Sequence, residues 1–220
     1  MEEQGMSKDQ EACVLQAAGV AGPGEDWWER FFPEDLPPEW QLEYYTHHHS
    51  RLLLPAAVWT AADPVFGDWA EAVPPALRLT LEWPPDLAPQ VGAERVRVLA
   101  DAIGEGLQAV VPGPMEPAQL QAMRVALDAV GLAHARVYGA GEPRTLARAE
   151  AAWFYPPLDS DVAGGAWQVV PQAGLDAPGW RALVEALSQA GGTGEIPVFL
   201  RARPERLSDF RTIAALLGLG

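Results

Sequence analysis

The sequence predicts a single α/β domain whose strands are arranged as in a barrel. Short apolar runs alternate along the chain with segments of helical period, a pattern typical of parallel strands joined by crossover helices. About half of the 220 residues are apolar (49%), which is enough to bury a sizeable core. The alternation predicts a TIM-barrel-like (β/α)8 fold. Because 220 residues is near the lower limit for that fold, we expect the barrel to be irregular or incomplete.

The expected strands are short apolar runs, several of which end at Pro or Gly. Neither residue continues a central ladder, so each marks a strand end. The runs are residues 14–18, 51–56, 77–83, 107–112, 134–139, 152–157, 166–171 and 197–202. Residues 158–165 alone separate the sixth run from the seventh, which is too short an interval for a helix. The barrel is expected to be irregular there, and an open doubly wound α/β sheet is the alternative.

The expected helices carry apolar residues at helical spacing between start and stop signals. The clearest begins at Pro117, ends before Gly131, and has Leu120, Met123, Leu127 and Val130 on one stripe. Similar patterns span residues 178–190, 94–103 and 207–217. Each stripe predicts packing against the sheet.

Charge and cysteine content exclude several classes of function. The net charge is −15 and the pI is about 4.5, so a polyanion would be repelled; we expect no nucleic-acid partner and no anionic membrane surface. Cys13 is the single cysteine, which excludes an internal disulfide and fits a reducing, cytoplasmic compartment. Residues 1–10 are expected to form a flexible polar tail ahead of one domain, residues 11–220. No apolar run approaches the roughly 20 residues of a membrane span.

One segment resembles a known family. Residues 32–45 read FPEDLPPEWQLEYY. This run is similar to the aromatic-Tyr-Pro, Leu-Pro, Trp-Leu and Tyr-Tyr signature that opens the first helix of the YecE-like family, domain of unknown function 72 (DUF72). Trp69, Val73 and Pro74, followed by the run 77–83, resemble the family's third-strand region. The resemblance covers residues 27–83 and implies a TIM-barrel-like fold, in a divergent and shortened member.

The departures from the family fall on its polar residues. The family's second strand reads Val-Glu-Ile-Asn-Ser-Thr-Phe-Tyr, whereas this chain has Leu53 in place of the Glu and Pro55 in place of the Asn. The resemblance therefore implies a barrel that has lost the carboxylate and the amide of the family's pocket. The activity of the family is not established, so the resemblance names no reaction.

In a barrel the site lies at the carboxyl ends of the strands, where the following loops meet. The side chains expected at or just beyond those ends are Trp59, Glu82, Trp83, Tyr138, Tyr155, Arg201 and Arg203. The four aromatic residues would form an aromatic mouth, or Trp59 and Trp83 would pack in the core. Glu82 is the candidate general acid or base, with Asp159 or Asp161 as a partner, unless these are ordinary solvated acids.

The arginines near the last helix are the strongest charge cluster. Arg201, Arg203 and Arg206 would hold a phosphate or carboxylate, or else form surface pairs with Glu205 and Asp209.

We expect neither a metal nor a cofactor. The adjacent side chains of residues 47–49, all His, diverge on a helix and cannot converge on one ion. Phosphate-loop, dinucleotide, Gly-x-Ser-x-Gly and HExxH motifs are also absent from the sequence.

Three hypotheses follow. The first is a degenerate barrel that acts as a binding or interaction module through its aromatic mouth. The second is an enzyme acting on a small anionic metabolite, such as a sugar phosphate, with Arg201 and Arg203 holding the anion and Glu82 as acid or base. The third is a homo-oligomer that buries its Trp-rich face against another copy.

Overall fold

The computed structural model describes residues 13–21, 30–37, 40–60, 74, 76–159 and 164–220. The expected tail, residues 1–10, lies outside these ranges, as does Asp161. The described residues form one sheet, whose strands are β1 (Cys13–Val20), β2 (Arg51–Leu54), β3 (Arg78–Trp83), β4 (Leu107–Pro112), β5 (Arg136–Val137), β6 (Glu142–Pro143), β7 (Ala149–Tyr155), β8 (Ala166–Pro171) and β9 (Gly194–Leu200). Their order across the sheet is β5-β4-β3-β2-β1-β9-β8-β7-β6.

Strand direction corrects one part of the predicted fold. The neighbours from β5 through β1 to β8 are parallel, as expected, but β7 is antiparallel to both β8 and β6. The prediction of eight parallel strands is therefore wrong for residues 152–157. The physical reason is the short connection 158–165, since antiparallel neighbours can be joined by a short loop and parallel neighbours cannot.

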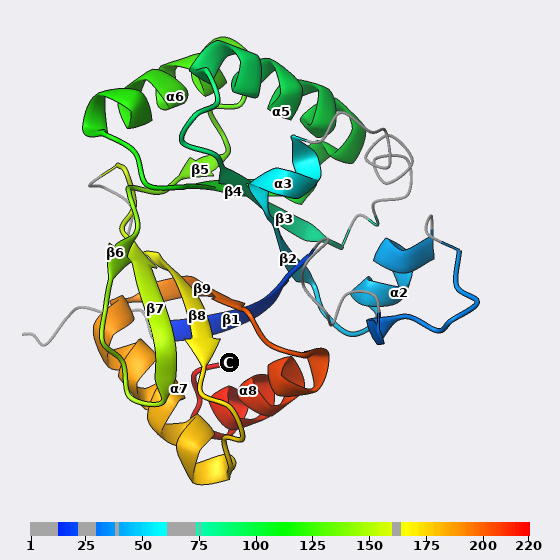
Figure 1. The fold of residues 1–220 in the computed structure, drawn as a ribbon, viewed down its shortest axis with the longest axis vertical. Coiled ribbons are helices and arrows are strands. Elements are labelled where there is room, and N and C mark those ends of the chain that lie inside the picture. The colour runs from blue at the N-terminus through cyan, green and yellow to red at the C-terminus, as the bar shows by residue number, and fades with distance from the viewer. Residues whose placement is uncertain (1–12, 22–29, 38–39, 61–73, 75, 160–163) are drawn as a thin grey trace, which may run out of the picture.

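The sheet curls until its two ends approach each other (Figure 1). Tyr138, after β5, forms an isolated antiparallel bridge with Pro157, after β7. Backbone hydrogen bonds flank the bridge: Gly139 N donates to Pro156 O at 2.6 Å, and Leu158 N donates to Val137 O at 3.1 Å. The molecule is thus a mixed α/β fold with an incomplete barrel, rather than an open doubly wound sheet.

Helices cover the outside of the curled sheet. They are α2 (Gln41–Thr46), α3 (Ala56–Trp59), α5 (Pro89–Ile103), α6 (Pro117–Ala129), α7 (Ala177–Gly191) and α8 (Pro204–Leu216). In Figure 1, α5 and α6 lie over β3, β4 and β5, whereas α7 and α8 lie against β1, β8 and β9. The four helices expected from apolar spacing are confirmed. In the described part of the chain, no helix combines the length and the apolar character that crossing a bilayer requires.

The apolar residues divide into two outer layers and one interior cluster. One outer layer packs β2, β3 and β4 against α5 and α6, and the other packs β1, β8 and β9 against α7 and α8. The interior cluster consists of Ala18, Val20, Leu53, Ala109, Val111, Tyr138, Tyr155, Ala166 and Phe199. Most of these side chains are small or medium in size, so the curled sheet can close tightly around them.

A buried tyrosine attaches α2 to the sheet. The Tyr45 hydroxyl accepts a hydrogen bond from Gly19 N at 3.2 Å and donates one to Arg51 O at 2.7 Å. Tyr45 is fully buried, and burial raises the pKa of its phenol well above the usual value. The hydroxyl therefore stays protonated and joins the ends of β1 and β2 through one side chain.

We predict that Tyr45→Phe lowers the free energy of unfolding by about 1–3 kcal/mol, because it leaves buried backbone groups without their hydroxyl partner. Tyr44→Phe is the matched control: Tyr44 lies in the same helix, half-buried, and its ring contacts other aromatic rings. Chemical denaturation of both variants measures the difference. Equal stabilities would contradict the role assigned to the Tyr45 hydroxyl.

Candidate functional site

A cavity of about 510 Å³ opens where the parallel strands end. We call it the mouth cavity. Its polar and aromatic side chains are Glu82 of β3, Trp153 and Tyr155 of β7, Gln168 of β8, and Arg201, which directly follows β9. The loops after β4 and β5 complete the wall with Pro and Gly residues. Three of the predicted site residues, Glu82, Tyr155 and Arg201, are therefore brought together from distant parts of the sequence.

A hydrogen-bonded row runs along one side of the mouth cavity. Arg201 can only donate, so the side-chain oxygen of Gln168 must face it. In that orientation the oxygen accepts from Arg201 Nε at 2.6 Å and Nη2 at 2.8 Å, and the amide nitrogen donates to the Tyr155 hydroxyl at 2.8 Å. Gln168 is buried, with 6% of its surface exposed, so these contacts satisfy an amide that is largely shielded from water.

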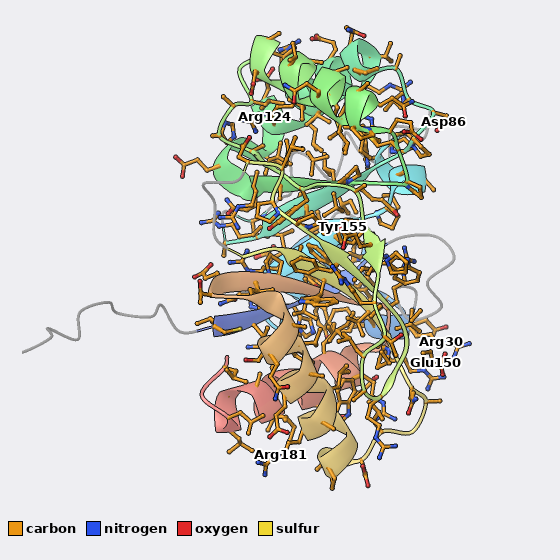
Figure 2. The ribbon with its side chains drawn as sticks, turned by 90° about the vertical axis from the view of Figure 1, so that its left-hand side faces the viewer. Arg30, Asp86, Arg124, Glu150, Tyr155 and Arg181 are labelled. Carbon is orange, nitrogen blue, oxygen red and sulfur yellow. The ribbon has the colours of Figure 1, made fainter. Side chains whose placement is uncertain are left out.

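The electrostatics of the mouth cavity keep the Tyr155 phenol neutral. Burial and the negative charge of Glu82 together raise the pKa of Tyr155 to about 12, against the opposing effect of Arg201. Figure 2 shows Tyr155 in the middle of the molecule, between the helix pair α5 and α6 and the pair α7 and α8. Tyr155 is thus a hydrogen-bond donor at neutral pH.

Glu82 is half-buried and points into the barrel. Its Oε2 accepts from the backbone N of Ala56 at 3.4 Å, which holds the carboxylate at the rim. Asp159, expected as a partner for Glu82, is exposed and does not line the mouth cavity. Among the residues that the structure describes, Glu82 is therefore the one carboxylate that lines the mouth cavity.

Trp59 and Trp83 do not line the mouth cavity, which corrects the predicted aromatic mouth. Both belong to the outer layer beneath α5 and α6, where they are 6% and 1% exposed and their rings lie 5.8 Å apart. Trp59 Nε1 donates to Glu82 O at 2.8 Å. The reason is strand alternation: since Glu82 points inward, its neighbour Trp83 must point outward.

Tyr138 and Arg203 also lie outside the mouth cavity. Tyr138 faces the interior but lines a smaller cavity of about 210 Å³ at the amino ends of the strands, together with Arg136 and Glu195. Arg203 is exposed and directly precedes α8. Arg206 of the predicted arginine cluster donates to Leu175 O at 2.8 Å, so the cluster does not converge on one anion.

Two residues of the mouth cavity escaped the sequence analysis, namely Gln168 and Trp153. The sequence does contain a signal for Gln168. It is the one amide in the apolar run 166–171, and a polar side chain within a buried strand needs a hydrogen-bonding partner in the protein. Trp153 also had a signal, because it lies two residues before Tyr155 and so shares the same face of the strand.

The histidines at the end of α2 have a structural role. His47 and His48 are exposed in the turn, whereas His49 is buried and its ring lies 5.1 Å from that of Tyr45. Burial and, to a smaller extent, the charge of Arg211 lower the pKa of His49 to about 4. Within the described ranges, no group of three His, Cys, Asp or Glu side chains is placed to hold a metal ion.

Comparisons with known proteins show little similarity. Neither a protein-family model nor a curated protein matches the chain. Among solved structures, a dipeptide epimerase from Enterococcus faecalis V583 aligns over 96% of this chain and 47% of its own, with 13% identity and a TM-score of 0.39. The chain thus spans about half the length of that enzyme. A match at this level carries no inference about activity.

We predict that Trp83→Ala lowers the free energy of unfolding by about 3–5 kcal/mol, because it empties a buried site beneath α5. Trp40→Ala is the control, since Trp40 is 60% exposed and its loss should change stability by less than about 0.5 kcal/mol. Denaturant melts of both variants measure the effect. If the two variants were equally stable, Trp83 could not be the core residue described above.

Proposed function

We propose that the chain binds a small anionic molecule in the mouth cavity and that Arg201 holds its negative charge. The observation that carries the proposal is the convergence of Arg201, Gln168, Tyr155 and Glu82 on one cavity of about 510 Å³. Pockets for small molecules are commonly about 300–1,000 Å³ and combine apolar walls with a few converging polar groups. The mouth cavity fits both criteria.

The charge of the whole chain supports a compact ligand rather than a polymer. A net charge of −15 repels polyanions at long range, whereas a short anion needs one local cation. Gln168 fixes the orientation of the Arg201 guanidinium through contacts to Nε and Nη2. A pre-oriented guanidinium binds a carboxylate or phosphate with a smaller loss of side-chain entropy.

The presence of Glu82 in the same cavity favours an enzyme as the second candidate function. In this form the bound anion is a metabolite, and Glu82 acts as general acid or base on a neighbouring group. Binding by Arg201 is common to both candidates. They differ in whether Glu82→Gln abolishes a reaction or only weakens binding.

Ancestry and location are part of the same proposal. A relationship to the YecE-like family is supported by the position of Leu53. This residue aligns with the family's pocket Glu, and its side chain lies in the interior cluster, where a pocket residue of a barrel is expected. In this account the β6–β7 hairpin replaces βα units of an eight-stranded barrel. A cytoplasmic location is supported by the free thiol of Cys13, which lies in β1.

Thermal melts with added anions test the proposed function. We expect inorganic phosphate, glycerol phosphate or gluconate to raise the melting temperature of the wild-type chain by about 5–10 °C near saturation. Arg201→Gln should lose most of this rise, measured against its own ligand-free melt. Arg203→Gln, two residues further on and outside the mouth cavity, should keep it.

The opposite results would reject the proposal. If none of the three anions raised the melting temperature, or if the Arg201 and Arg203 variants responded alike, the mouth cavity would not be an anion site.

A further inference from the structure

We infer that the protein has a second binding site, for a phosphate group, in a cavity between α8 and the turn that joins α2 to β2. We call it the α8 cavity, and its volume is about 500 Å³. The polar side chains that line it are Gln16, His49, Ser50, Ser208, Arg211 and Thr212. None of its lining residues lines the mouth cavity, so the inference does not depend on the proposed function.

Three parts of the chain meet at the α8 cavity. They are residues 15–17 of β1, the turn residues 49 and 50, and one face of α8. The α8 residues that line the cavity, 208, 211, 212 and 215, follow one another at helical spacing, so they share that face. Arg211 Nη1 donates to His48 O at 2.5 Å, which joins α8 to the turn.

His49 provides the observation that points to a ligand. Only 5% of the residue is exposed, and in the described part of the chain no group hydrogen-bonds its imidazole ring. Trp167 and Trp180 carry the described side-chain nitrogens that are sealed in the protein without a partner, so the ring nitrogens of His49 are not sealed. His49 lines the α8 cavity, where an occupant supplies the partner that its ring lacks.

The charge of the α8 cavity favours an anion. Arg211 is the one charged side chain among the described residues that line it. Its printed contact, His48 O, is a neutral carbonyl, and within the described ranges no carboxylate forms an ion pair with it. Asp209, on the same helix, pairs with Arg206 instead. Because burial and Arg211 lower the pKa of His49 to about 4, its imidazole is neutral at pH 7 and adds a donor without adding charge.

The arrangement of the donors favours a phosphate over a carboxylate. The Arg211 guanidinium and the Ser208 hydroxyl come from α8, whereas the Ser50 hydroxyl and one N–H of His49 come from the turn. Donors on separate walls suit the tetrahedral oxygens of a phosphate group, while the two oxygens of a carboxylate lie in one plane. Arg211 is exposed, so we expect binding in the millimolar range, weaker than binding in the mouth cavity.

NMR titration of the His49 ring in the whole chain at pH 7 tests the inference. Long-range ¹H–¹⁵N spectra resolve the rings of the 4 histidines, and His49→Gln identifies the signals of His49 by their loss. We expect inorganic phosphate to shift these signals until they saturate. Sodium chloride at equal ionic strength and acetate should leave them in place. Glycerol phosphate in the same titration distinguishes a phosphate monoester from free phosphate as the better ligand.

Two variants assign the response to the α8 cavity. Arg211→Gln should weaken phosphate binding at least about tenfold, because it removes a charged donor. Ser208→Asp, which places a carboxylate on the exposed cavity face of α8, should weaken it similarly and replaces the first variant if that one fails to fold. Arg203→Gln, exposed just before α8, and Arg201→Gln, in the mouth cavity, are the controls and should leave the response of His49 unchanged.

Several results would overturn the inference. Signals that stay in place with phosphate would show that the α8 cavity holds only water. An equal response to sodium chloride or acetate would contradict a phosphate site, and so would a response that survives both Arg211→Gln and Ser208→Asp. Loss of the response in Arg201→Gln would place the phosphate in the mouth cavity. Since the signal comes from His49 and not from the melting temperature, a negative result here leaves the proposed function of Arg201 standing.

Discussion

The structure depends on the backbone contacts that join the two ends of the curled sheet. Gly139 N donates to Pro156 O and Leu158 N donates to Val137 O, on either side of the Tyr138–Pro157 bridge. A Cβ at position 139 would lie 3.1 Å from the ring of Pro156, so glycine permits this close approach. Without closure, two sheet edges and the interior cluster would face water.

Closure also forms the mouth cavity. It brings the end of β7 against the loop after β5, where a Cβ at Gly141 would lie 2.6 Å from the Tyr155 ring. Tyr155 is thereby held beside Gln168 and within electrostatic reach of Glu82, which lies on a strand five places away in the sheet. A residue with a side chain at position 141 would displace the phenol, so the geometry of the loop and the chemistry of the site are linked.

The strands and helices could be predicted from the sequence because their signals are local. Apolar runs marked every described strand except the two-residue β6, and apolar residues at helical spacing marked the four long helices, although α5 begins at Pro89 rather than at the expected residue 94. Strand direction was not available from such signals, since an apolar run reads the same for parallel and antiparallel strands. The short segment 158–165 was the one hint of the reversal at β7.

The site was predictable where one polar residue ended an apolar strand, as for Glu82 and Arg201. The assignment of Trp83 failed because adjacent residues of a strand face opposite sides, a constraint that the sequence alone already contained. Gln168 could have been found as a lone amide in an apolar run. Its contacts to Tyr155 and Arg201 could not, because they depend on the closure of the sheet.

Amide hydrogen exchange at Gly139 and Leu158 tests the closure most directly. Both amides donate across the junction of the sheet ends, so we expect each to exchange at least about 100-fold more slowly than an unprotected amide. Exchange of both at the unprotected rate, while the amides of β1 and β9 remain protected, would show an open sheet. In that case the ends of β3 and β7 would not share a cavity, and the account of the site given above would be contradicted.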